Sequence, residues 1–163
     1  MNKNSPLIKG VATGIVMSAI ALISFYTTPA TATGLQYFIY LVYAVGIIWT
    51  LITYSKTPGY TRKFVDLFGQ GFRCFIVVTL IMVVLIGIFS AFHPEIAEEA
   101  AVYYKKELVA KKDKTPAEVE EAVTNAKKHF TTGLISLNLF KFLFIGAAFT
   151  AAGATSLLIF RKK

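Results

Sequence analysis

The sequence predicts an all-α membrane protein with four transmembrane helices. Hydrophobic residues make up 55% of the 163 residues and charged residues only 16%, whereas a soluble domain carries about a quarter charged residues. Four apolar runs are each long enough for the roughly 20 residues that cross a bilayer core. A single long polar stretch separates the third run from the fourth. We therefore expect one membrane domain over 1–163, with spans at about 7–27, 35–54, 72–92 and 137–160 and an extramembrane helical hairpin over 94–133.

The first apolar run follows two lysines, Lys3 and Lys9. A secretory signal peptide is the alternative, because Ala30-Thr31-Ala32 resembles a small-residue cleavage site. We favour a span, because the run is longer than a typical signal core. The first and last spans also carry small residues at helical spacing, which lets helix backbones approach closely in lipid. The expected packing positions are Gly10, Gly14, Ser18, Gly146, Ala147, Ala151 and Gly153.

The second span is rich in aromatic residues. Tyr37 and Tyr54 lie near its two ends, as interfacial aromatic belts require. Gln36, Tyr40 and Tyr43 recur at i, i+4 and i+7, so they share one helix face. Because buried tyrosine hydroxyls need partners, we expect this face to point into the bundle.

A basic connection joins the second and third spans. Pro58-Gly59 marks a turn. After it, Phe64, Leu67, Phe68 and Phe72 recur at helical spacing among basic residues, which predicts a short interfacial helix before the third span. The residues expected to contact lipid headgroups are Arg62, Lys63, Arg73 and Arg161.

The polar stretch between the third and fourth spans predicts two helices. The first, over 95–112, begins with acids and ends with lysines, which complements the helix dipole. The second opens at Thr115-Pro116, where Glu118 completes a capping box. We expect Gly133 to break the helix or let it bend into the fourth span. Two interpretations remain open: a solvated connection, or a docking surface for a partner.

Lys141 is the only full charge well inside an apolar run. Charges inside membranes are functional candidates by default, although a lysine near the boundary can extend its ammonium to the headgroups. The alternative is a polar pocket in the outer half of the bundle. Its members would be Gln36, Tyr40, Tyr43, Asn138 and Lys141.

The sequence offers no catalytic motif, so we expect a non-enzymatic protein without a cofactor. His93 and His129 flank the hairpin at its two ends, and Glu95 is close to His93 in the sequence. A metal site needs three or four converging ligands, and this spacing does not predict them. Cys74 is the single cysteine, which excludes an internal disulfide. The formal charge of +8 lies beside apolar segments, so membrane lipids are the expected partners and nucleic acid is not.

Orientation follows from the distribution of Lys and Arg. These residues gather near the amino terminus, in the connection before the third span and at the carboxyl terminus, whereas acids offset the hairpin lysines. We therefore expect both termini to be cytoplasmic and the hairpin 94–133 to be periplasmic.

The chain resembles a family of small bacterial inner-membrane proteins classed as a domain of unknown function. The matching residues are Gly59-Tyr60, Phe68-Gly69-Gln70-Gly71-Phe72, Phe92-His93-Pro94-Glu95 and Phe160-Arg161-Lys162-Lys163. The resemblance implies four spans, a charged helical insert before the last, and a location in the bacterial inner membrane. It implies no catalytic residue. It also implies that some relatives are encoded beside membrane glycosyltransferases.

We expect a non-catalytic subunit or scaffold of a larger membrane complex, associated through the hairpin and the small-residue helix faces with other membrane subunits. The alternative is a membrane protein that binds a lipid or a small molecule in the pocket around Lys141.

Overall fold

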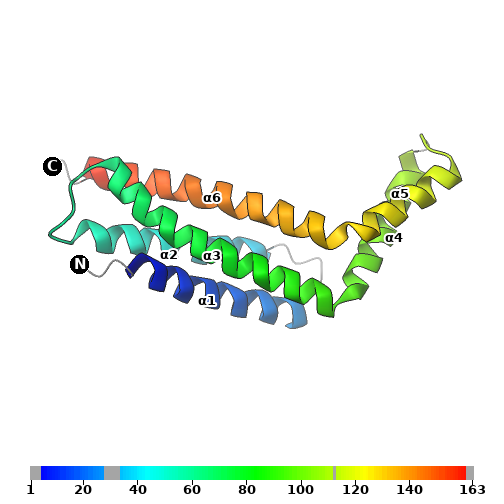
Figure 1. The fold of residues 1–163 in the computed structure, drawn as a ribbon, viewed down its shortest axis with the longest axis horizontal. Helices are drawn as coiled ribbons and strands as arrows, with labels where there is room; N and C mark the ends of the chain where they lie inside the picture. The colour runs from blue at the N-terminus through cyan, green and yellow to red at the C-terminus, as the bar shows by residue number, and fades with distance from the viewer. Residues whose placement is uncertain (1–4, 28–33, 112, 161–163) are drawn as a thin grey trace. The chain divides into compact units, whose positions relative to one another are not determined.

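The computed structural model describes residues 5–27, 34–111 and 113–160, which form six helices. Four of these helices are long and apolar enough to cross a membrane, which confirms the predicted all-α membrane fold with four candidate spans. The helices are shown in Figure 1. Their bounds are α1 Ser5–Thr27, α2 Gly34–Ser55, α3 Phe64–Phe92, α4 Pro94–Lys111, α5 Pro116–Lys128 and α6 Phe130–Phe160, with α1, α2, α3 and α6 as the candidate spans.

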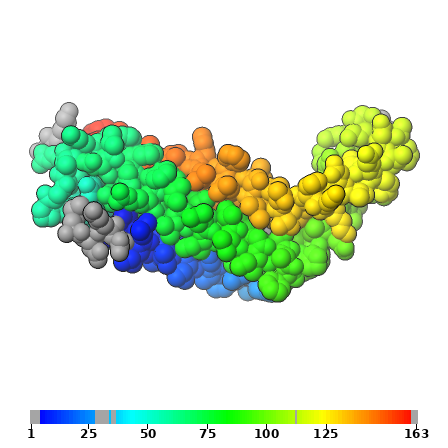
Figure 2. All heavy atoms as spheres, viewed as in Figure 1, coloured from blue at the N-terminus to red at the C-terminus, as the bar shows by residue number. Residues whose placement is uncertain are grey.

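The residues group into two compact units. The first contains the chain up to Met82 and from Leu139 onwards, and the second is Val83–Asn138. Within the first unit, segments of all four long helices run alongside one another (Figure 1). In the space-filling view, this part of α3 lies between α1 and α6 (Figure 2).

Small residues allow the helices of the first unit to approach closely. A methyl group at Gly10 would lie 2.7 Å from the carbonyl oxygen of Cys74, and one at Gly14 would lie 2.7 Å from Ile81 on α3. Gly146 of α6 faces Tyr43 and Phe75, and Gly153 faces Leu51. The residues at the centre of this unit have almost no exposed surface: Met17, Tyr43, Ile47, Leu51, Phe75 and Val78.

The second unit contains the α4–α5 hairpin. Its apolar stripes meet inside, where Ala101, Leu108 and Val119 are buried. Ion pairs join Lys105 to Glu120 and Lys127 to Glu98 across the two helices. The predicted capping box at the start of α5 is present, with Pro in the first turn.

Two helix boundaries differ from those expected. The short helix predicted before the third span is not a separate element, because α3 continues unbroken from Phe64 to Phe92. Gly133 does not end a helix either, since α6 begins at Phe130 and runs through it. The change of direction occurs at His129, whose φ of −101° and ψ of 8° depart from helical values. No described glycine has a positive φ, so none requires a left-handed conformation.

Candidate functional site

The structure brings together two members of the pocket predicted around Lys141. The Lys141 Nζ lies over the Tyr40 ring, 5.2 Å from its centroid. Lys141 is half-buried rather than enclosed. A cation held over an aromatic face is stabilised by the negative charge of the ring surface.

The other members of that predicted pocket either form hydrogen bonds with other groups or are not described. Tyr43 is fully buried, and its hydroxyl donates to the Phe142 carbonyl oxygen at 3.1 Å. Its ring also meets Phe142 edge-on at 5.9 Å between centroids, so this tyrosine ties α2 to α6. Asn138, in the second unit, donates its amide to the Leu134 carbonyl oxygen of its own helix. The Gln36 side chain lies outside the described part of the structure.

Three of the four cations expected at the membrane surface lie in described parts of the chain. Arg62 and Lys63 are exposed just before α3, and Arg73 is exposed on α3 itself. Arg62 has a φ of 58°, in the left-handed region that L-residues other than Asn and Asp rarely adopt. Arg161 lies outside the described residues.

The histidines do not assemble a metal site with their neighbours. The described residues contain no group of three or more His, Cys, Asp and Glu that could hold an ion. His93 Nδ1 lies 2.5 Å from Glu95 Oε1, and this hydrogen bond holds the pKa of the Glu95 carboxyl below its ordinary value. His129 caps the carboxyl end of α5 through its backbone.

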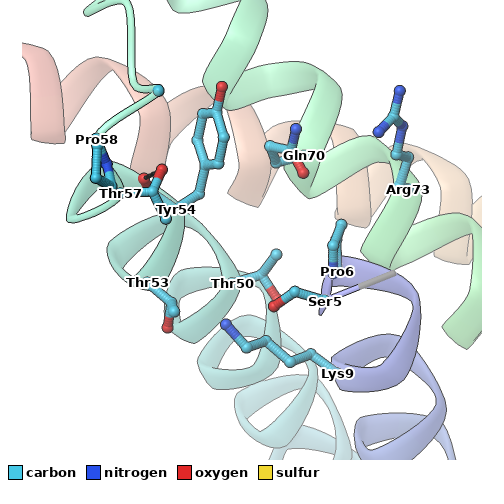
Figure 3. A pocket seen from close by; sticks show the side chains of 11 residues that line it. Ser5, Pro6, Lys9, Thr50, Thr53, Tyr54, Thr57, Pro58, Gln70 and Arg73 are labelled. Carbon is cyan, nitrogen blue, oxygen red and sulfur yellow. Dashed lines mark hydrogen bonds between the residues drawn. The ribbon is translucent and has the colours of Figure 1, made fainter. Parts of the chain in front are cut away.

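A cavity with a volume of about 670 Å³ opens at one end of the first unit. Figure 3 shows the side chains that line it. It lies where α1 begins, where α2 ends and where α3 has passed its first turns. Charged and hydrogen-bonding side chains contribute to its lining, and none of the described lining residues is acidic. The lining residues are Ser5, Pro6, Lys9, Thr50, Thr53, Tyr54, Thr57, Pro58, Gly59, Gln70 and Arg73.

Lys9 is the most enclosed cation of this cavity. It is only 9% exposed, and its Nζ lies 5.2 Å from the centroid of the Trp49 ring. The sequence predicted Lys9 only as a base that precedes the first span. The sequence does indicate a polar face on α1, because Ser5, Lys9 and Thr13 recur every four residues and so share one face of the helix.

Two glycine contacts were also missed by the sequence reading. Gly46 packs directly against Thr13, and Gly71 packs against Thr150. Both glycines pair with a threonine on another helix rather than with a second small residue. Spacing of small residues along a single helix could not reveal these contacts.

A family described as a protein of unknown function (DUF4199) matches residues 9–161. No curated protein and no solved structure matches the chain.

Proposed function

The chain belongs to the DUF4199 family of proteins of unknown function, and we propose that it acts as a non-catalytic subunit of a larger membrane complex. In this proposal the four candidate spans anchor the protein and the α4–α5 hairpin docks a partner protein. One candidate partner is a membrane glycosyltransferase, which the family resemblance implies, and that association stays a prediction.

The observation that carries the proposal is an apolar patch on the charged hairpin. Val102, Tyr103 and Val109 of α4 are 56%, 74% and 57% exposed. Val102 and Val109 are seven residues apart, two turns of helix, so they lie on the same face, and Tyr103 flanks them. We call these three residues the α4 patch.

The α4 patch is not needed for the packing of the hairpin itself. The hairpin buries Ala101 and Leu108 of α4 against α5, and its two ion pairs lie across the same junction. Exposed apolar residues are ordinary on helices that face lipid. On α4, whose 18 residues include seven acidic or basic side chains, contact with a protein partner explains them better.

The partner expected from this patch is a protein with an apolar helix or loop surface. Tyr103 supplies a large ring and a hydroxyl, a combination that is common at the centre of protein interfaces. The charged neighbours Glu99 and Lys106 are exposed beside it and would form the polar rim.

The test is purification of the tagged full-length chain from its native membrane in a mild detergent, with the co-eluting proteins identified and quantified. We expect one protein at a stoichiometric level. In a chain with V102S, Y103S and V109S together, that protein should fall to background, because the apolar contact area is removed.

A matched control separates loss of docking from loss of folding. Glu121 and Thr124 are exposed on α5 and are not part of the α4 patch, so E121Q with T124S should keep the partner. Both variants should keep the thermal unfolding temperature of the unaltered chain. Elution of the unaltered chain as a clean monomer or homo-oligomer would refute the proposal.

A further inference from the structure

The cavity at the start of α1 contains a buried lysine that has no anionic partner among the described residues. We propose that this cavity binds a phosphate-bearing ligand whose phosphate contacts Lys9 and whose substituent extends toward Gln70 and Tyr54, with Arg73 at the rim. This site is separate from the α4 patch and does not depend on the function proposed above.

The first step is the state of the Lys9 ammonium. Lys9 is 9% exposed, and among the described residues it forms neither an ion pair nor a hydrogen bond. Removing a cation from water is costly unless an anion or an acceptor compensates for the lost hydration. The Trp49 ring compensates only in part, because a ring face offers about 0.5–2 kcal/mol to a cation.

The second step is the set of donors that remain available. The threonine hydroxyls of the cavity are already used, because Thr50 donates to Gly46, Thr53 to Trp49 and Thr57 to Tyr54, each through a backbone carbonyl. Tyr54 and Gln70 also line the cavity, and neither side chain has a hydrogen-bond partner within the described residues. Figure 3 shows Lys9 extending from α1 toward α2, whereas Gln70 on α3 and the Tyr54 hydroxyl lie on the other side of the cavity.

The third step is the charge around the cavity. Besides Lys9 and Arg73, the connection between α2 and α3 contributes Lys56, Arg62 and Lys63. The acid of this region, Asp66, does not line the cavity, and it accepts a hydrogen bond from the Thr61 hydroxyl. The amino-terminal end of α1 adds the positive end of its helix dipole. An anion is therefore the ligand that this cavity favours.

The fourth step is the choice of anion. The cavity lies at the ends of three candidate spans, the level at which lipid headgroups meet a bundle. A volume of about 670 Å³ is large enough for a phosphate with its substituent. A phosphate accepts strong, charge-assisted hydrogen bonds, which matches the Lys9 ammonium, and a substituent on that phosphate can extend across the cavity toward Gln70 and Tyr54. The phosphate can belong to a lipid headgroup or be soluble, and the experiment distinguishes these two sources.

The test uses Trp49, the only tryptophan in the chain, as its reporter. Because the Lys9 ammonium lies over that ring, a ligand that draws the ammonium away should change the Trp49 fluorescence. The purified full chain in a neutral detergent is titrated with short-chain phosphatidic acid, with phosphatidylcholine of the same chain length, and with inorganic phosphate. Native mass spectrometry of the same samples counts the bound lipids independently of fluorescence.

We expect a saturable response to phosphatidic acid with one lipid bound per chain. Phosphatidylcholine should give little response, because its choline cation cancels the charge of its phosphate and is repelled by Lys9 and Arg73. Lys9→Gln should weaken binding by about ten- to a hundredfold, the range for losing a hydrogen bond to a charged group. Lys9→Arg should restore most of the affinity because it keeps the charge. Gln70→Leu should weaken binding less.

Lys128→Gln is the control. Lys128 is exposed on α5 and does not line the cavity, so this variant removes one lysine charge without changing the site. The Lys128→Gln chain should bind phosphatidic acid as the unaltered chain does, and every variant should unfold in a single cooperative transition, which shows that it is folded.

Each outcome decides the proposal. Saturation by phosphatidic acid alone supports a lipid source, and saturation by inorganic phosphate at similar concentration supports a soluble one. The proposal would be overturned if neither phosphatidic acid nor inorganic phosphate saturates the chain, if phosphatidylcholine binds as tightly as phosphatidic acid, or if Lys9→Gln binds as tightly as the unaltered chain.

Discussion

At the scale of single residues, close helix contacts depend on which atom faces each glycine. Gly10 approaches a backbone carbonyl, which cannot move aside as a flexible side chain can. Gly69 on α3 has no atom within 4 Å of the position that a methyl group would take. The same substitution at these two helical glycines therefore has opposite consequences.

We expect Gly10→Ala to lower the thermal unfolding temperature of the purified chain. The new methyl group would lie 2.7 Å from the Cys74 carbonyl oxygen, and overpacking of this kind costs about 1–3 kcal/mol. Gly69→Ala meets open space and should be neutral or stabilising by up to about 1 kcal/mol, because alanine loses less backbone freedom on folding. Equal unfolding temperatures for the two variants would mean that α1 does not pack tightly against α3.

At the scale of elements, the sequence predicted the ends of the long helices better than their starts. The spans expected from 72 and 137 belong to helices that begin at Phe64 and Phe130, whereas the expected ends at 92 and 160 agree with the structure. At the start of α5, by contrast, a specific local signal was present. Thr115, Pro116 and Glu118 form a local capping signal, and the structure contains it. The apolar spacing from Phe64 to Phe72 predicted an interfacial helix separate from the span, yet α3 continues through Gly69 and Gly71 without a break. Their helical conformation shows that glycine permits a break without requiring one. In the same way, α6 passes through Gly133.

The cap of α5 should respond to pH. The Thr115 backbone N–H and hydroxyl donate to Glu118 Oε2 at 2.7 and 2.8 Å, and these bonds hold the pKa of the Glu118 carboxyl below its ordinary value. A lowered pKa in the folded state means that the stabilisation is complete above the ordinary glutamate pKa. It is lost as the pH falls through the lowered value.

Amide hydrogen exchange in the first turn of α5 measures this effect. At neutral pH the unaltered chain should be better protected than Glu118→Gln, and the difference should vanish as the pH falls through the lowered pKa. Comparing the two proteins at each pH removes the intrinsic pH dependence of exchange. Glu121→Gln, which is exposed on the same helix outside the cap, should match the unaltered chain throughout. A difference that persisted in acid would contradict the assignment.

At the scale of the whole molecule, composition and apolar run length were sufficient to predict four candidate spans and the hairpin. These are properties of contiguous sequence, and each can be evaluated one segment at a time. The cavity could not be predicted in this way, because α1, α2, the α2–α3 connection and α3 all contribute to it. The surroundings of Lys9 arise only on folding, which brings Trp49 and Gln70 from two other helices to the same cavity region as α1.

Orientation in the membrane remains a prediction from the distribution of basic residues, and single cysteines can test it. Cys74 is fully buried, so Cys74→Ala provides a background without a reactive thiol. Into it, Gly59→Cys places a thiol in the α2–α3 connection and Asp113→Cys places one between α4 and α5, both at exposed positions. A membrane-impermeant maleimide should label Asp113→Cys in intact spheroplasts and Gly59→Cys only after lysis, because positive connections stay cytoplasmic. The reverse labelling would invert the predicted orientation. Labelling of both thiols from one side would mean that α3, the one candidate span between them, does not cross the membrane.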